Sequence, residues 1–336
     1  MNKVLSIIKN LNPFSNKKVD NKIIYTLKIL LSTFIVYFVS LIIAEGVIIG
    51  GSYLFGYNAT DKQMPYDIML LCTFYGYLIT ILLFILFTKK INKIELNKIG
   101  LDKNIKTFLK GILIGIVSLS LIIIPLLMIG AIKFNGINNN INWLFFVLYL
   151  FGYLIQSFME ELICRGYLLH RLSERISFVL AITISVLFFS IGHFDKMFND
   201  GMLIGLIGII NLLLISLIFV VITLKNKNIY GATGFHFIWN FALFNVIGLN
   251  LSGLEITNSI FKMEAVNKFL TGYSYGIESS IITTIMLIIV LLFAKKNIKI
   301  KWSEYFEIAK ANRTDENPFL HDIIIIGSEW VERIFK

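Results

Sequence analysis

The sequence predicts an all-α membrane protein, a polytopic helical bundle of about eight transmembrane helices. Hydrophobic residues make up 57% of the 336 residues and charged residues only 15%. The mean hydropathy is +0.78. These values lie far outside the range of soluble globular domains. The apolar residues also form stretches of about 20 residues, the length of a helix that crosses a bilayer.

Eight stretches reach this length, and they cover residues 27–50, 68–88, 108–132, 143–163, 176–194, 203–224, 230–249 and 277–294. An even number of spans puts both chain ends on the same side of the membrane. Of the Lys and Arg residues, 25 lie in the terminal segments and in the loops on that side, five lie in the other loops, and Lys110 begins the third span. The positive-inside rule therefore predicts cytosolic N- and C-termini.

The spans divide the chain into three parts. Residues 1–26 form a cytosolic N-terminal segment, and the apolar spacing of its first eleven residues predicts an amphipathic helix at the membrane surface. This segment lacks the cleavage site of a removable signal peptide. Residues 27–294 form the transmembrane domain, and residues 295–336 form a cytosolic tail of mixed charge.

The composition also excludes several classes of function. The net charge of +10 is spread over alternate loops, so it reflects topology, and we expect no nucleic-acid partner. Two cysteines, Cys72 and Cys164, are too few for a disulfide framework or a structural zinc site. The excess of Lys over Arg and the abundance of Ile and Asn suggest a bacterial source, and hence the bacterial cytoplasmic membrane.

A pair of carboxylates, Glu160 and Glu161, ends the apolar stretch that begins at Trp143, and Arg165 follows. An ionisable side chain at bilayer depth costs roughly 2.5 to 3.5 kcal/mol on insertion scales, so such residues mark candidate functional sites. On a helix, Glu161 and Arg165 are four residues apart and can pair, whereas Glu160 points about 100° away and stays available. The alternative is that both glutamates are interfacial charges at the end of a span.

Two more polar groups interrupt the apolar stretches. His193 lies at the end of the fifth stretch, beside a glycine, and by itself it indicates little. His236 and Asn240 share one face of the seventh stretch, so both can aim at a single atom. Polar contacts between helices are the competing interpretation. Two of the four histidines nevertheless lie at membrane depth, which favours a common polar site.

In chain order, the three groups read EExxxR, FxxxH and HxxxN. This pattern resembles the signature of the CAAX protease and bacteriocin-processing family (CPBP, also called Abi), a family of intramembrane proteases. The resemblance covers about residues 140–250, which would be the motif core of a transmembrane protease domain at 27–294. It implies one role for each motif residue: Glu160 as the general base that activates water, Glu161 and Arg165 as structural support, His193 as an assistant at the water or the developing charge, and His236 with Asn240 as the oxyanion site.

The resemblance implies an intramembrane endopeptidase that cleaves a membrane-anchored or amphipathic peptide at the lipid bilayer. CAAX-type processing, bacteriocin maturation and self-immunity are the roles that it suggests. We favour a glutamate mechanism without a cofactor. A zinc enzyme with Glu160, His193 and His236 as ligands is the alternative mechanism, and a non-catalytic immunity or transport protein is the alternative from another class.

Other polar residues lie outside the motifs. We expect Glu45 and Glu278 at the outer ends of the first and last spans, as interfacial charges, and Asn211 either in a bond between helices or at a cavity. The predicted spans conflict at one point. They place Glu160 near the cytosolic face but His193 about 17 residues along the fifth span, toward the opposite face. Either that helix starts deeper or bends, or the predicted boundaries are wrong by a turn or more.

Overall fold

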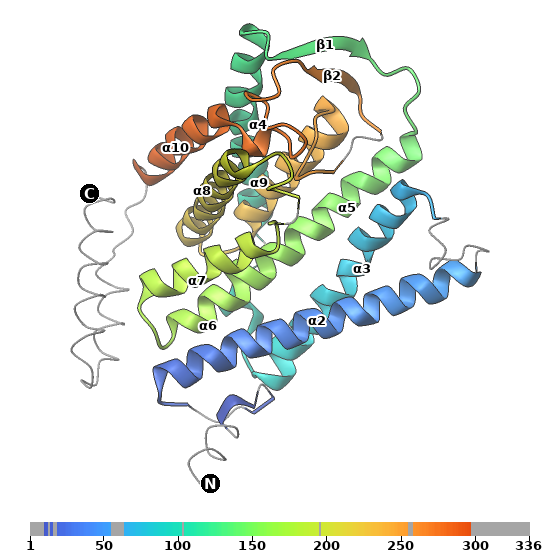
Figure 1. Cartoon of the computed structure of the whole chain (residues 1–336). Coiled ribbons are helices and arrows are strands. Elements are labelled where there is room, and N and C mark those ends of the chain that lie inside the picture. The colour runs from blue at the N-terminus through green and yellow to red at the C-terminus, as the bar shows by residue number, and fades with distance from the viewer. Residues whose placement is uncertain are drawn as a thin grey trace.

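The computed structural model describes residues 10–12, 14–15, 19–54, 64–102, 104–194, 196–254 and 258–296. The chain is mainly helical, as predicted, with one small sheet (Figure 1). Its elements are α2 (Lys22–Leu54), α3 (Tyr66–Leu86), η2 (Phe87–Ile91), η3 (Leu96–Ile99), α4 (Ile105–Met128), β1 (Ile132–Ile137), α5 (Trp143–Glu161), η4 (Leu162–Leu168), α6 (Leu169–Ser173), α7 (Phe178–Ile191), α8 (Met202–Asn226), α9 (Tyr230–Phe241), η5 (Ala242–Ile247), β2 (Phe261–Ala265), η6 (Ile277–Ser279) and α10 (Ile281–Lys296). Of the predicted N-terminal helix only residues 10 and 11 fall within the described part, and the predicted tail lies outside it after residue 296.

Each predicted apolar stretch contains a helix, but the helices differ in length. Within the described residues, five are long and apolar enough to cross a membrane by length and composition: α2, α3 with η2, α4, the continuous rod from α5 to α6, and α8. Helices α7 and α10 are shorter apolar helices, and α9 has 12 residues before it continues into η5. The spans predicted at 176–194, 230–249 and 277–294 are therefore shorter as helices than the sequence suggested.

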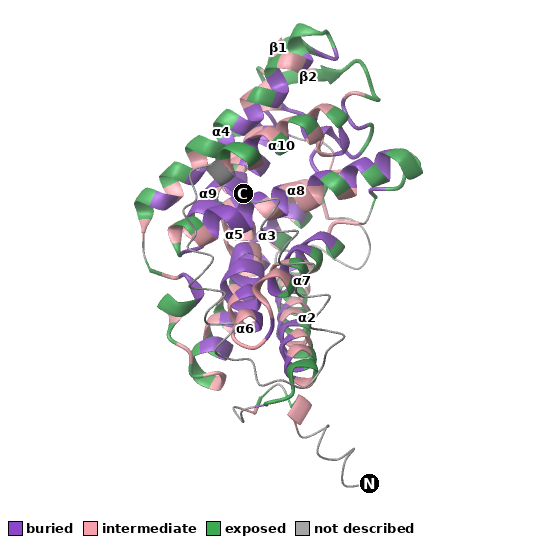
Figure 2. Ribbon diagram, turned by 90° about the vertical axis from the view of Figure 1, so that its left-hand side faces the viewer, coloured by how far each residue is buried: buried purple, intermediate pink, exposed green. Residues whose placement is uncertain are grey.

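The outer surface of the bundle is apolar. Along α2, side chains such as Leu31, Phe34 and Phe38 are exposed, whereas the interior-facing Ile29 and Val36 are buried. Figure 2 shows the same division, with buried residues gathered inside the bundle and exposed residues on its outer faces. Large exposed apolar surfaces of this kind are unusual on soluble monomers but suit contact with lipid. The chain is an integral membrane protein.

The boundary predicted for the fourth span, residue 163, is wrong. Helix α5 begins at Trp143, where the Asn142 side chain accepts a hydrogen bond from the backbone N–H of Phe145 at 3.2 Å. It continues through the π-helical η4 into α6, and the whole rod of 31 residues ends at Ser173. The glutamate pair therefore lies in the middle of a long helix and not at its end. Arg165, which the sequence placed in a cytosolic loop, lies inside the same rod.

The chain then turns back, and α7 packs beside the rod. Ser177 caps α7 by accepting a hydrogen bond from the backbone N–H of Leu180, and Ser185 Oγ donates to the carbonyl oxygen of Cys164 at 2.8 Å. The turn lies about midway in sequence between Glu160 and His193. Because both arms rise by about 1.5 Å per residue, the two residues return to a similar level. The conflict in predicted depth therefore came from a wrong helix boundary.

Close contact between α4 and α9 fixes the helix that carries His236. A Cβ atom at Gly111 would lie 2.0 Å from the carbonyl oxygen of Gly231, and one at Gly234 would lie 2.2 Å from the carbonyl oxygen of Phe108. Only glycine allows the two backbones to approach this far, as at other helix contacts in membranes. The position of α9 thus depends on the absence of side chains at these glycines.

Within the part of the chain that the structure describes, a small sheet departs from the all-α prediction. Strands β1 and β2 pair antiparallel, with Lys133 opposite Glu264 and Ile132 opposite Ala265. Asn135 Nδ2 also donates to Glu264 Oε2 at 2.7 Å. The strands lie more than a hundred residues apart in the sequence, so no local hairpin pattern predicts them. The sheet joins the loop after α4 to the segment after α9.

Candidate active site

Glu161 and Arg165 form the ion pair that their spacing predicts. Arg165 Nη1 lies 3.1 Å from Glu161 Oε1, and both side chains have an exposed fraction of 0%. Arg165 Nη2 donates to the Oγ and the carbonyl oxygen of Ser216 on α8, at 2.6 and 3.1 Å. A buried charge is tolerated when it is paired and hydrogen-bonded in this way. The pair therefore ties α8 to the rod.

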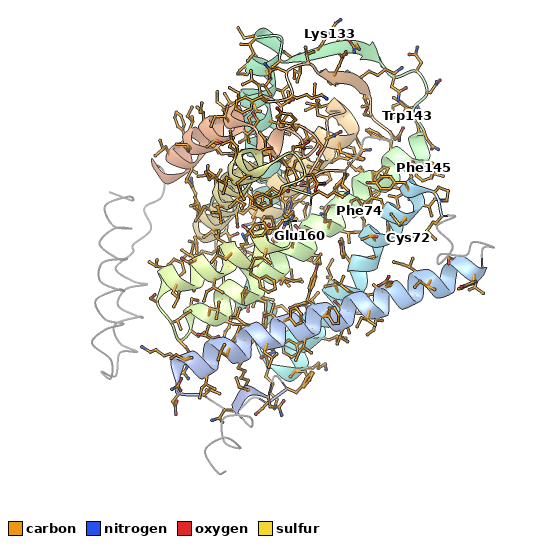
Figure 3. All side chains as sticks on the ribbon, in the orientation of Figure 1. Cys72, Phe74, Lys133, Trp143, Phe145 and Glu160 are labelled. Carbon is orange, nitrogen blue, oxygen red and sulfur yellow. The ribbon has the colours of Figure 1, made fainter. Side chains whose placement is uncertain are left out.

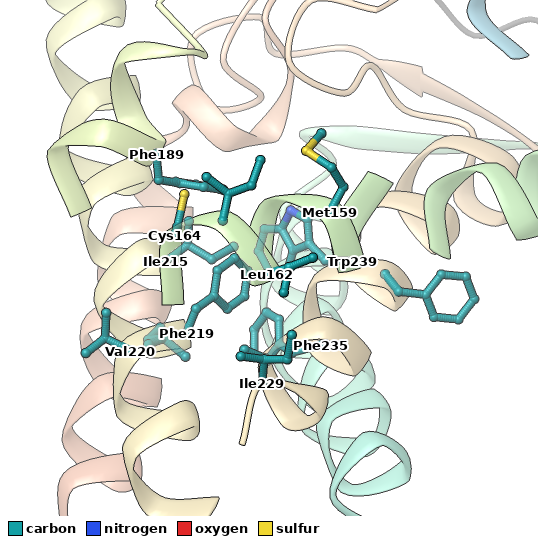
Figure 4. Close-up of a cluster of buried hydrophobic side chains, with 14 of the residues drawn as sticks. Met159, Leu162, Cys164, Phe189, Ile215, Phe219, Val220, Ile229, Phe235 and Trp239 are labelled. Atoms are coloured by element: carbon teal, nitrogen blue, oxygen red, sulfur yellow. The ribbon is translucent and has the colours of Figure 1, made fainter. Parts of the chain in front are cut away.

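Two aromatic rings complete the surroundings of Arg165. The guanidinium carbon lies 4.5 Å from the ring centroid of Phe189 and 5.2 Å from that of Phe219, distances suited to cation–π contact. The Phe219 ring also stacks on the His236 imidazole, with centroids 4.9 Å apart. These contacts connect the first motif to the third through one apolar wall. Figure 4 shows part of this wall, where Leu162, Phe219 and Phe235 pack together.

The imidazole of His236 lies between the two glutamates. Its Nδ1 is 3.2 Å from Glu161 Oε1, and its Nε2 is 3.6 Å from Glu160 Oε2. An ionised carboxylate only accepts hydrogen bonds, so Nδ1 carries a proton toward Glu161. Glu161 thus holds both Arg165 and His236. The sequence analysis had assigned it to Arg165 alone.

Glu160 is the less buried of the two glutamates, with a side-chain exposed fraction of 16%. It lies near the centre of the bundle on α5 (Figure 3). Its Oε1 accepts a hydrogen bond from Gln156 Nε2 at 3.3 Å. Its buried Oε2 has no hydrogen-bond partner within the described part of the chain. A buried carboxylate oxygen without a protein donor is a site at which a water can be expected.

A small cavity brings the second and third motifs together. His193, His236 and Asn240 line it, and so does Gln156, the residue that holds Glu160. Its volume is about 60 Å³, which is enough for at least one water. The Asn240 side chain is buried and makes no hydrogen bond to another described residue. Its amide donors are therefore available to a molecule in the cavity.

His193 is held in a single orientation. Its Nδ1 lies 3.0 Å from the carbonyl oxygen of Phe189, which can only accept, so Nδ1 is the donor and Nε2 of the neutral ring is an acceptor. Tyr275 donates its hydroxyl to the carbonyl oxygen of His193 at 3.2 Å. Burial raises the pKa of Tyr275 above its usual range, so the hydroxyl keeps its proton at neutral pH.

The residues of the predicted zinc alternative do not form a ligand group. Among the described residues, no three side chains of His, Cys, Asp or Glu are grouped as the ligands of a metal ion would be. His193 and His236 share the cavity, and Glu160 lies against His236, but the three do not converge on one point. Their arrangement does not fit the three-ligand geometry of a catalytic zinc site.

Several residues of the site had no signal in the motifs. Gln156 is one helical turn before Glu160, a spacing that could have identified it. Glu278, predicted to be an interfacial charge, instead lines the cavity. Asn211, predicted to bond between helices or to line a cavity, donates to the carbonyl oxygens of Glu278 and Ser280. Glu45, by contrast, is exposed on α2.

The class of the protein follows from this site and from a comparison with protein families. Both support an intramembrane endopeptidase at the level of the family. Residues 142–242 match the family described as type II CAAX prenyl endopeptidase Rce1-like, and the matched segment contains all three motifs. The match confirms the resemblance to the CPBP family that the motifs predicted. Neither the curated proteins nor the solved structures gave a match to the chain.

Proposed function

We propose that this chain hydrolyses a peptide bond of a membrane-anchored or amphipathic peptide by means of a water that Glu160 activates. The observation that carries the proposal is the position of His236, whose two nitrogens face Glu161 and Glu160. Beside it lies a water-sized cavity lined by His193 and Asn240. A general base, a fixed imidazole and free amide donors thus occur in one water-excluding region of the bundle.

The reaction would proceed in two steps. In the first, Glu160 takes a proton from the water as its oxygen bonds to the carbonyl carbon of the substrate. Asn240 would donate a hydrogen bond through Nδ2 to the oxyanion that forms, and His236 would donate through Nε2 when that nitrogen also carries a proton. His193 would orient the water through its own Nε2. In the second step, Glu160 returns the proton to the amide nitrogen as the C–N bond breaks, and the carboxylate is regenerated. Donors fixed in advance where charge develops supply a large part of such catalysis.

The buried pair of Glu161 and Arg165 would not react itself but would hold His236 in place. Glu161 Oε1 accepts from both Arg165 and His236, so it would set the direction of the imidazole. This resembles the role of a carboxylate that orients a catalytic histidine in other hydrolases. Glu160 is then left for the reaction, because its only described donor is the side chain of Gln156.

Loop charges and composition support a cytosolic position of both termini and a location in the bacterial cytoplasmic membrane. For the substrate, the family description supports a prenylated CAAX peptide as the first probe. An amphipathic peptide without a lipid is the second probe, as a model of bacteriocin maturation. Cleavage of one probe and not the other would separate the two roles.

The test uses the full chain, purified in detergent or in lipid nanodiscs, and a farnesylated CAAX peptide with a fluorophore and a quencher. Glu160→Gln should lower kcat by roughly 10²- to 10⁴-fold, the usual contribution of a general base. Glu45→Gln, the same change at an exposed glutamate of α2, should leave kcat unchanged. If the wild-type chain cleaves neither probe, or if Glu160→Gln remains fully active, the proposed function is wrong.

A further inference from the structure

One carboxylate, Glu278, lines the cavity, and the three motifs do not include it. Glu278 lies on η6, 36 residues after the end of the segment that matches the protease family. It lines the cavity together with His193, His236 and Asn240, and it is half-buried. An ionisable residue inside a membrane bundle is a candidate for function unless a structural reason accounts for it.

Glu278 connects two separate parts of the cavity wall. Its Oε1 accepts a hydrogen bond from Trp239 Nε1 on α9 at 3.2 Å. Its Oε2 accepts two hydrogen bonds from Ser252, one from the backbone N–H at 2.8 Å and one from the hydroxyl at 2.6 Å. Both oxygens thus point at donors on elements that line the same cavity. This arrangement fixes the carboxylate in place.

The residue is itself held from α8. Asn211 Nδ2 donates to the backbone carbonyl oxygens of Glu278 and Ser280, at 2.9 and 2.8 Å. The short turn that carries Glu278 is therefore fixed by a helix on its far side as well as by its own side chain. The connection runs from α8 through η6 to α9. A fixed carboxylate can in turn fix the groups that donate to it.

Trp239 connects Glu278 to the third motif, His236 and Asn240. It lies three residues after His236 and immediately before Asn240 on α9, and its side chain is fully buried. Its ring stacks on Phe235 with centroids 5.9 Å apart. The hydrogen bond to Glu278 adds a fixed direction to this packing, and so limits rotation of α9 about its axis. That rotation would turn His236 and Asn240 away from the cavity.

A purely packing role does not explain a carboxylate here. In the described part of the chain Glu278 forms no ion pair, so three hydrogen bonds alone compensate its charge. An apolar side chain would fill the space without the desolvation cost of a charge. A carboxylate at this position is explained by its two oxygens, which orient the donors of Trp239 and Ser252 at the same time.

We propose that Glu278 is a positioning residue of the active site, which holds Trp239 and Ser252 and thereby aims His236 and Asn240 at the cavity. This inference rests on the proposed function. It extends the site beyond residues 142–242, the segment shared with the protease family. Glu278 itself does not touch the reacting atoms.

The kinetic test compares variants on the farnesylated CAAX probe. Glu278→Ala should lower kcat by roughly 100-fold, because misplaced catalytic groups cost about that much, and KM should change little. Glu278→Gln retains one carbonyl oxygen as an acceptor and should recover part of the lost kcat. Glu45→Ala is the control. In the Glu278→Ala background, Trp239→Phe should lower kcat no further, because the hydrogen bond between Trp239 and Glu278 is already absent.

A second measurement does not depend on activity. In a chain with Trp143, Trp302 and Trp330 replaced by Phe, Trp239 is the single tryptophan. Glu278→Ala should shift its emission maximum and increase its quenching by acrylamide, whereas Glu45→Ala should do neither. An unchanged Trp239 signal, or full kcat in Glu278→Ala, overturns the positioning role. If the wild-type chain cleaves no probe, the proposed function fails, and the fluorescence still decides whether Glu278 fixes Trp239.

Discussion

Glu161 Oε1 lies 3.2 Å from His236 Nδ1, so the carboxylate that the sequence assigns to a salt bridge also holds the imidazole of the site. The same oxygen accepts from Arg165 Nη1 at 3.1 Å. One buried oxygen thus joins the first motif to the third. Because Arg165 and His236 can be replaced independently, the contribution of Glu161 to stability can be measured apart from its contribution to activity.

The first prediction concerns this shared carboxylate. Glu161→Gln leaves the buried Arg165 without a counter-charge and should destabilise the protein by about 3 to 5 kcal/mol. Adding Arg165→Met removes the uncompensated charge, so the double variant should regain much of the lost thermal stability. It should stay inactive, however, because His236 still lacks its ionised partner. Thermal unfolding in detergent and cleavage of the CAAX probe measure the two effects, and recovery of both together would contradict this division.

The second prediction concerns the oxyanion site. Asn240→Ala should lower kcat by about 10²- to 10³-fold, the usual cost of removing one oxyanion donor, with little change in KM. Its side chain makes no hydrogen bond to another described residue, so the melting temperature should change little. Asn240→Asp is the matched control for shape, since it keeps the size but replaces the donors with acceptors. Asn240→Asp should be as slow as Asn240→Ala, and an active Asn240→Asp would exclude a donor role.

The third prediction concerns metal dependence. No three metal-ligating side chains are grouped within the described residues, so EDTA and 1,10-phenanthroline should leave cleavage of the CAAX probe unchanged. Metal analysis of the purified, active protein should find less than stoichiometric zinc. If a chelator abolishes cleavage and added zinc restores it, the zinc alternative with Glu160, His193 and His236 replaces the glutamate mechanism.

The sequence predicted the helical fold and the three motifs for the same physical reason: charged and polar residues are conspicuous in long apolar stretches. It could not locate the end of the helix that carries Glu160. The π-helical segment from Leu162 to Leu168 follows from tertiary packing and leaves no periodic signal. That one error put His193 at the wrong depth and Arg165 in a loop.

Glu278 shows a second limit of sequence reasoning. A glutamate near the end of a span looks the same whether it faces water or a cavity, since only the three-dimensional contacts to Trp239 and Ser252 tell the two apart. Glu45, with the same position relative to its span, is exposed. Short β-strands far apart in the sequence, such as Ile132–Ile137, are missed for a related reason: their pairing is non-local.

The last prediction concerns the contact that places α9. Gly111→Ala would put a Cβ atom 2.0 Å from the carbonyl oxygen of Gly231, so α4 and α9 would have to separate. Overpacking of this kind costs about 1 to 3 kcal/mol, and it would also move His236. The variant should therefore unfold at a lower temperature and cleave the probe more slowly. Gly50→Ala on α2 is the matched control, because nothing lies within 4 Å of its added Cβ and alanine favours a helix. Equal melting temperatures for the two variants would show that the contact between α4 and α9 does not limit stability.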